Sequence, residues 1–142
     1  MTHGIDTSFL VAVEVGSHAE HVRARAQFQK FLKAGDMFAL APQVLAEFIH
    51  IVTDPRRFSA PLELEQAIER AEIWWNATEV VHIFSTAEST LLFLNWLNEH
   101  RLGRKRLLDT MFASTLLAGE VASLLTLNRD DFEIFGSFSF PK

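Results

Sequence analysis

Apolar residues along this chain gather in short runs that alternate with longer segments of helical character. Runs typical of buried strands end at Ile5 and cover residues 37–41 ("MFALA"), 80–84 ("VVHIF") and 122–126 ("ASLLT"). "FSF" at residues 138–140 is a candidate edge strand. Helices are predicted for the segment "FLVAVEVG" and for residues 17–34, 42–54, 62–77, 86–101 and 108–118.

Turn-forming residues mark several of these boundaries. Gly16 ends the first helix, Gly35 follows the second, and Pro42 occupies the first turn of the third. Since strands and helices alternate almost throughout, the sequence predicts an α/β fold: a three-layer α/β/α sandwich around a central, mainly parallel sheet. No internal repeat or linker-like segment interrupts the pattern, so residues 1–142 are expected to form a single domain.

Composition narrows the class of protein. With 142 residues, of which 49% are hydrophobic, the chain can bury a substantial core. Its apolar segments fall well short of the roughly 18 to 20 residues that a membrane span needs, and "MTHGIDTSFL" lacks the basic start of a signal peptide. The absence of cysteine excludes disulfides and thiolate chemistry. Together these features favour a cytoplasmic protein without membrane association.

The net charge of -5 argues against a simple nucleic-acid-binding module, because phosphate contacts normally require a basic surface. A nuclease whose acidic residues hold cations stays open, since bound ions reverse the local field. Basic residues are clustered in "RLGRKR", just before Asp109. Arg104, Lys105 and Arg106 are therefore candidate RNA contacts, and the alternative interpretation is a solvated loop at a helix end.

Acidic residues follow the ends of the predicted strands. Asp6 comes directly after the first strand, and Glu47 lies in the second turn of the helix after "MFALA". Asp109 lies in the first turn of the helix that leads into "ASLLT", and Asp131 follows that strand. The carboxyl ends of parallel strands meet at one edge of a sheet, and a crossover helix begins at the same edge. These four acids are expected to converge there.

Each acid also has an ordinary structural interpretation. Asp6 suits a helix N-cap, Glu47 belongs to a polar stripe of its helix, and Asp109 is a favourable first-turn charge. Asp130 has Glu133 three residues later, a pattern that predicts Asp130 as the cap and leaves Asp131 free to face a cleft. Convergence of all four acids favours a site for Mg²⁺, which prefers oxygen ligands and serves phosphodiester hydrolysis.

Other catalytic arrangements find little support. His18 and His21 are spaced for a transition metal, but a solvated helix start explains them more simply. Ser8 lies in no G-x-S-x-G turn, and no glycine-rich phosphate loop follows a strand. The adjacent Trp74 and Trp75 and the leucine stripe at residues 91–97 fit the core or a partner surface.

Three stretches carry a resemblance to a known family: "GIDTSFLVA", "PQVLAEFIHIVTDPRRF" and "LLDTMFASTLLAGEVASLLTLNRDDFEIFG". The chain resembles PIN-domain ribonucleases and looks most like the VapC-type toxins of toxin–antitoxin pairs. The resemblance implies a catalytic acidic cluster, with three of the acids as metal ligands and further residues as polar supports. The implied cluster is Asp6, Glu47, Asp109 and Asp131; the metal ligands are Asp6, Asp109 and Asp131; the supports are Thr126, Asn128 and Ser8.

The same resemblance implies Mg²⁺ or Mn²⁺ as cofactor, an RNA substrate cut to leave a 5′-phosphate, a homodimer and a cognate antitoxin. Many relatives carry Asp where this chain has Asn128, and a neutral amide predicts a weakly held second metal. The alternative is a catalytically inactive PIN-like or receiver-like partner-binding domain. The receiver form is disfavoured because the late strand ends in "LLTLN", without the lysine that a phosphoryl group needs.

Overall fold

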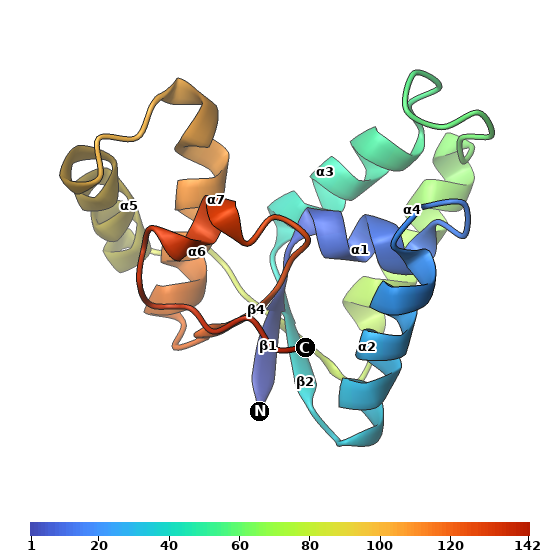
Figure 1. Ribbon diagram of the computed structural model, residues 1–142, viewed down its shortest axis with the longest axis horizontal. Helices are drawn as coiled ribbons and strands as arrows, with labels where there is room; N and C mark the ends of the chain where they lie inside the picture. The colour runs from blue at the N-terminus through green and yellow to red at the C-terminus, as the bar shows by residue number, and fades with distance from the viewer.

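The computed structural model describes residues 1–142 and is built around a parallel sheet of four strands in the order β3-β2-β1-β4 (Figure 1). The strands are β1 (Thr2–Ile5), β2 (Met37–Leu40), β3 (Val80–His82) and β4 (Ser123–Leu125). β1 pairs with both β2 and β4, so the strand order reverses beside β1. In parallel sheets this reversal leaves a crevice at the carboxyl edge.

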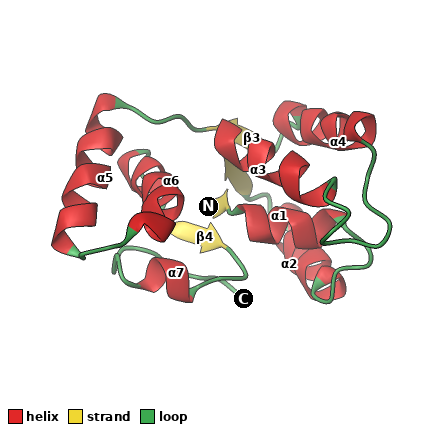
Figure 2. Cartoon of the chain, turned by 90° about the horizontal axis from the view of Figure 1, so that it is seen from above, coloured by secondary structure: helices red, strands yellow, loops and turns green.

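Helices cover both faces of the sheet, which confirms the predicted α/β/α sandwich. Seen from above, α1 to α4 lie on one side of the strands, and α5 and α6 lie on the other (Figure 2). The helices are α1 (Thr7–Glu14), α2 (His21–Lys33), α3 (Pro42–Val52), α4 (Leu64–Asn76), α5 (Ala87–Glu99), α6 (Leu107–Ala118) and α7 (Asp130–Glu133), with a 3₁₀ turn η1 (Arg104–Arg106). None of these helices is long and apolar enough to cross a membrane.

The core accounts for the apolar residues of the central strands, such as Ile5 of β1 and Phe38 and Leu40 of β2. Phe9, Phe38, Phe48 and Phe132 are fully buried between the sheet and the helices on its two faces. Gly4 in β1 allows α6 to pack directly on the sheet, because a Cβ at this position would lie 2.8 Å from Leu116 Cδ2. This close approach matters for function because α6 carries Asp109.

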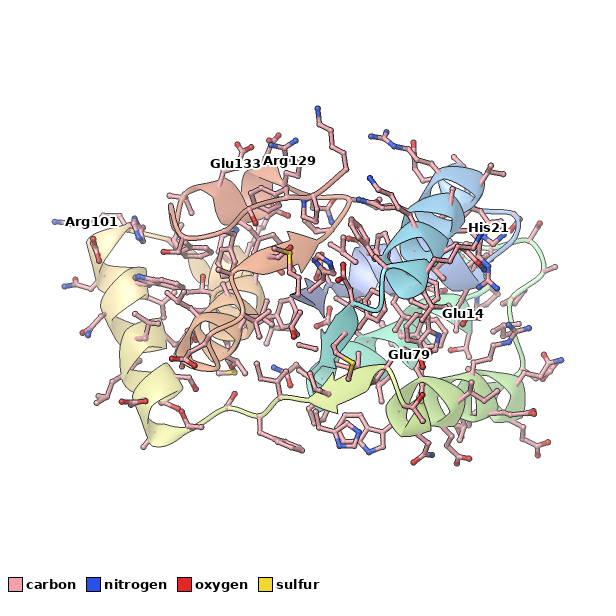
Figure 3. All side chains as sticks on the ribbon, turned by 90° about the horizontal axis from the view of Figure 1, so that it is seen from below. Glu14, His21, Glu79, Arg101, Arg129 and Glu133 are labelled. Atoms are coloured by element: carbon pink, nitrogen blue, oxygen red, sulfur yellow. The ribbon has the colours of Figure 1, made fainter.

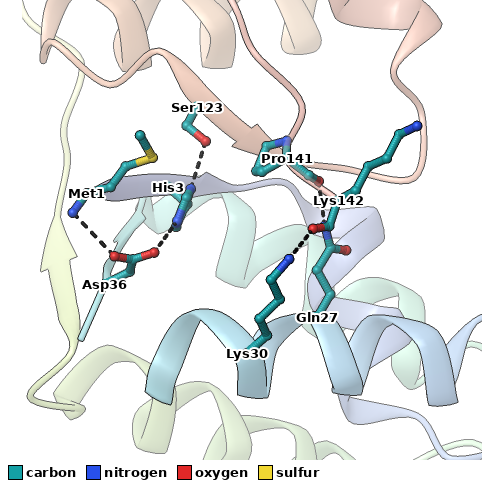
Figure 4. Close-up of polar contacts among 8 residues, drawn as sticks. All are labelled: Met1, His3, Gln27, Lys30, Asp36, Ser123, Pro141 and Lys142. Atoms are coloured by element: carbon teal, nitrogen blue, oxygen red, sulfur yellow. Dashed lines mark hydrogen bonds and ion pairs between the residues drawn. The ribbon is translucent and has the colours of Figure 1, made fainter. Parts of the chain in front are cut away.

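A buried histidine connects the strands at the amino edge of the sheet by hydrogen bonds (Figure 4). His3 in β1 forms hydrogen bonds with Ser123 Oγ of β4 at 2.7 Å and with Asp36 Oδ2, beside β2, at 2.9 Å. Asp36 also pairs with the amino group of Met1 at 3.4 Å. These bonds connect three strands at the edge opposite their carboxyl ends, so they stabilise the sheet without entering the crevice.

Several predicted boundaries were wrong. The second helix begins at His21 and not at Ser17, because residues 16–20 form turns in which His18 Nδ1 accepts the backbone N–H of Glu20 at 3.0 Å. "FSF" contributes only an isolated bridge between Ser139 and Ser123. Asp130 is not the cap of α7: Arg129 occupies that position, and no side chain caps the helix.

Candidate active site

Asp6 lies at the carboxyl end of β1, next to the reversal of strand order. Its backbone N–H donates to the carbonyl oxygen of Leu125 at 3.0 Å, which fixes it against the end of β4. The Asp6 carboxylate accepts hydrogen bonds from Ser8 Oγ at 2.9 Å and from Thr126 Oγ1 at 2.7 Å. It makes no capping hydrogen bond to α1, although it occupies the N-cap position. The side chain is therefore held by hydroxyl groups and not used to cap the helix.

The same hydroxyls organise the loop that follows β4. Ser8 Oγ and Thr126 Oγ1 lie 3.3 Å apart. Ser8 Oγ also accepts the backbone N–H of Leu127 at 3.0 Å, and Thr126 Oγ1 accepts that of Asn128 at 3.0 Å. The loop that leads to Asp131 is thus anchored to Asp6, and Ser8 and Thr126 lie where polar supports of the acidic cluster were expected.

A cavity of about 540 Å³ opens at this point. All four predicted acids line it: Asp6 after β1, Glu47 of α3, Asp109 of α6 and Asp131 of α7. Ser8 and Asn128 line it as well. Four segments that are distant in sequence therefore deliver carboxylates to one space, as the topology predicts.

The acids in this cavity disfavour one another's ionisation. Burial, followed by repulsion from Asp6 and Asp131, raises the pKa of Asp109 to about 6, and the nearby charge of Arg106 opposes the rise. Partial burial, with repulsion from Asp6 and Asp109, also raises the pKa of Glu47. Burial raises the pKa of Asp6, although hydrogen bonds from Thr126 and Ser8 work in the other direction. A bound cation would relieve this repulsion.

Arg106 occupies a different position from its two basic neighbours. It is half-buried, and its Nη2 donates a hydrogen bond to the backbone oxygen of Asp131. Its Nε is buried without a hydrogen-bond partner. Arg104 and Lys105 are exposed and lie outside the cavity lining. Arg106 therefore connects the start of α6 with α7, and so links the segments that carry Asp109 and Asp131.

The cavity lining also includes His18, which the sequence analysis assigned to a solvated helix start, and Arg57 and Phe58, which it did not consider as site residues. Arg57 Nε lies 3.6 Å from Asp54 Oδ2, and the backbone N–H of Arg56 donates to Asp54 Oδ1 at 2.9 Å. An aspartate that precedes proline at a helix end often forms such a turn. The dipeptide Asp54-Pro55 was the sequence signal for this turn, and the turn brings Arg57 and Phe58 to the cavity.

Oxygen atoms supply most of the potential metal ligands here, from carboxylates, an amide and a hydroxyl. This is the donor set that Mg²⁺ and Mn²⁺ prefer. No three acidic or histidine side chains close around one point as a group that could hold a metal ion. The arrangement fits a Mg²⁺-like ion, which commonly takes only one or two carboxylates directly and fills its other positions with water or phosphate oxygens.

The fold and the site define a parallel α/β domain with an acidic cavity at the reversal point of its sheet. Residues 5–136 match the model of the PIN domain family, and the chain belongs to this family. No curated protein sequence gives a significant match.

Solved structures of similar fold include two with 20% sequence identity and a TM-score of 0.69. One is Mycobacterium tuberculosis VapC20, a sarcin–ricin loop cleaving toxin; the match covers 98% of this chain and 97% of the VapC20 chain. The other is Rickettsia felis VapBC2 bound to a promoter DNA fragment, covering 99% and 98%. VapBC-1 of nontypeable Haemophilus influenzae has 18% identity, a TM-score of 0.68, and coverage of 100% and 98%. At these identities the similarity shows a shared fold.

Proposed function

We propose that this chain is a divalent-metal-dependent endoribonuclease and the toxin of a toxin–antitoxin pair. The observation that carries the proposal is the meeting of four carboxylates in one cavity, where burial and mutual repulsion raise the pKa values of Asp6, Glu47 and Asp109. Family membership supports phosphodiester chemistry, and the fold shared with an RNA-cleaving toxin supports RNA as the substrate.

Asp6, Asp109 and Asp131 are the proposed ligands of Mg²⁺ or Mn²⁺, with one or two of them bound directly and the remainder through water. Such an ion polarises a phosphoryl oxygen and lowers the pKa of a bound water. Ser8 and Thr126 hold the Asp6 carboxylate in one orientation through their hydrogen bonds. Asn128 lines the cavity with an uncharged amide, so we propose that a second ion is held more weakly than the first.

Glu47 is the proposed proton-transfer group. It lies on α3 and is more exposed than Asp6, so it can exchange protons with solvent. Its raised pKa brings it closer to neutral pH, where a carboxylate can take a proton from an attacking water and release it again. We propose that water attacks phosphorus, that the P–O3′ bond breaks, and that the products are a 3′-hydroxyl and the 5′-phosphate expected of the family.

The toxin role includes two protein contacts, with a cognate antitoxin and with a second copy of the chain. Two neighbours of similar fold are VapBC structures, which supports the antitoxin. Large apolar side chains are exposed on and beside α5 and α6, which supports protein contacts there. They include Phe84, Leu91, Leu94 and Leu108. Light scattering of the purified protein would give the oligomeric state, and a monomer at working concentrations would refute the homodimer.

The test of the activity is cleavage of bacterial RNA by the purified protein with Mg²⁺, with Mn²⁺ and with EDTA. We expect cleavage with either ion, none with EDTA, and none for Asp109→Asn at equal protein concentration. Expression in bacteria should likewise arrest growth for the parent chain and not for the variant. Undiminished cleavage in excess chelator would refute the metal mechanism. Metal binding without any RNA cleavage would favour the inactive partner-binding alternative.

A further inference from the structure

A second cavity, of about 560 Å³, adjoins the acidic one and has the opposite charge. Four cationic side chains line it, namely Arg23, Lys30, Arg129 and Lys142, and Glu20 is the one acidic side chain in the lining. Its walls are α2, the loop between β4 and α7, and residues 140–142. In a chain whose net charge is -5, this basic cleft is a marked local excess of positive charge.

The basic cleft lies beside the acidic cavity, with which it shares a lining residue. Leu127 lines both cavities and is 38% exposed. Thr126 lines the basic cleft and at the same time donates its hydroxyl hydrogen to the Asp6 carboxylate. A linear ligand that leaves the acidic cavity over this loop would therefore enter the basic cleft next.

Arg23 and Arg129 of the cleft are available to a ligand, whereas Lys30 already donates a hydrogen bond to Lys142. Arg23 lies 3.8 Å from Glu20 and its side chain is 81% exposed. Arg129 pairs with Glu133 at 3.5 Å on α7, where both side chains are about half exposed (Figure 3). Exposed ion pairs of this kind contribute little free energy, so a phosphate group can replace the carboxylate partners at small cost.

The cleft also offers an aromatic surface. The Arg129 guanidinium lies 5.0 Å from the ring centroid of Phe140, which is half-buried. Residues 140–142 are seated on α2, where Lys30 Nζ donates to the main-chain oxygen of Lys142 at 2.8 Å (Figure 4). A charged groove with an arginine and an aromatic ring is typical of surfaces that follow single-stranded nucleic acid.

We propose that the basic cleft binds the phosphate backbone of single-stranded RNA that flanks the cut site. This inference rests on the proposed ribonuclease function and specifies where the rest of the substrate lies. The position of the cleft beside the carboxylate cavity favours RNA over an acidic protein segment, because a polyanion that extends from the proposed metal site would next meet Arg129, Arg23 and Lys30. The cleft contributes to substrate affinity and not to the chemical step.

The chain offers a matched pair of variants on one helix. Arg23→Ala/Lys30→Ala removes two cleft charges from α2, and Arg25→Ala/Lys33→Ala removes the same two residue types from α2 outside the cleft. Both variants have the same net charge, so a difference in their RNA affinity depends on where the charges lie and not on how many are removed. Melting temperatures establish that both are folded.

Binding is measured by fluorescence anisotropy in EDTA, which prevents cleavage, with a labelled single-stranded RNA long enough to span both cavities. The cleft variant should raise Kd roughly threefold to tenfold at low salt. It should also reduce the slope of log Kd against log salt concentration by about 1 to 1.5, since each phosphate contact on a single strand contributes about 0.7 to that slope. The control variant should change each value far less. With Mg²⁺ present, the cleft variant should raise KM and keep kcat.

The outcomes separate the two proposals. If the parent chain cleaves RNA and the two variants bind it equally, the cleft inference is wrong and the ribonuclease proposal stands. If the parent chain neither binds nor cleaves RNA, the ribonuclease proposal itself fails. Oligoglutamate is the remaining probe: if its binding depends on Arg23 and Lys30 while RNA binding does not, the cleft accommodates an acidic protein segment and the inference is overturned.

Discussion

The acidic cavity and the basic cleft share Leu127 as a lining residue but hold their charges in opposite ways. The acidic cavity concentrates carboxylates that are partly removed from water, and the pKa values of Asp6, Glu47 and Asp109 rise as a result. The basic cleft keeps its charges exposed and loosely paired. Buried like charges suit a site that requires a cation and performs chemistry, whereas exposed charges suit a surface that binds a polyanion reversibly.

The contrast predicts that the two regions control different kinetic constants. Asp6→Asn or Asp109→Asn should lower kcat for RNA cleavage at least a hundredfold, because each removes a charge from the proposed ligand set. RNA affinity in EDTA should fall little or even improve, since negative repulsion is reduced. Steady-state kinetics together with anisotropy measures both quantities. Either variant keeping full activity would mean that the catalytic acids are misassigned.

Arg106 sharpens the comparison because it is a basic residue that belongs to the acidic region. Arg106→Ala should lower kcat roughly tenfold with little change in KM, since α7 loses its hydrogen bond at Asp131. The pKa of Asp109 should rise further, and the acidic limb of the pH–rate profile should move to higher pH. Arg104→Ala is the control, because Arg104 is exposed and should leave kcat unchanged. An unchanged kcat for Arg106→Ala would contradict the positioning role, and an equal fall in kcat for both variants would mean that Arg106 acts only through its charge.

The raised pKa of Asp109 also predicts the stability of the metal-free protein. The folded state holds the Asp109 proton up to about pH 6, while the unfolded chain releases it near its ordinary value, so stability falls as pH rises through this interval. Asp109→Asn removes this loss and should stabilise the metal-free protein by about 1 to 2 kcal/mol at pH 7. The free energy of urea unfolding, measured for both proteins at pH 4.5 and pH 7 in EDTA, tests this prediction. A variant that is less stable than the parent at pH 7 would refute the repulsion.

The smallest effect is expected at Asp130. This residue is exposed, and its side chain does not cap α7, so Asp130→Ala should change stability by no more than about 0.5 kcal/mol and leave cleavage intact. Asp131→Asn, one position later, should reduce cleavage at least tenfold because Asp131 lines the cavity. Melting curves and cleavage rates for the two variants check the assignment. If Asp130→Ala abolished cleavage while Asp131→Asn retained it, Asp130 and not Asp131 would be the residue of the acidic site.

The position of the acidic cavity could be predicted from the sequence because it follows from the order of strands and helices. Asp6, Glu47 and Asp109 follow strand ends or begin helices at one edge of a parallel sheet, and that geometry needs no knowledge of side-chain packing. The incorrect cap at Asp130 has a local cause. The backbone N–H of Asp131 already bonds to Asn128, and those of Phe132 and Glu133 bond to Arg129, so the turn closes before Asp130 can cap it.

Sequence could not reveal the features that depend on side-chain direction and loop shape. Arg106 looked like one of three equivalent basic residues, and only the packing of α6 against α7 distinguishes it. His18, Arg57 and Phe58 reach the cavity through turns whose paths are set by tertiary contacts. The basic cleft combines α2 with residues 124–129 and 140–142, which are about a hundred positions further along the chain.

The most direct test of the central claim is an NMR titration of the Asp109 carboxyl group with and without saturating Mg²⁺. If repelling carboxylates form a cation site, its pKa in the metal-free protein should lie near 6 and should fall well below that value when Mg²⁺ is bound. The same shift should be absent in Asp6→Asn, where a proposed ligand is missing. A pKa for Asp109 that is already ordinary without metal, or that Mg²⁺ does not move, would contradict the account.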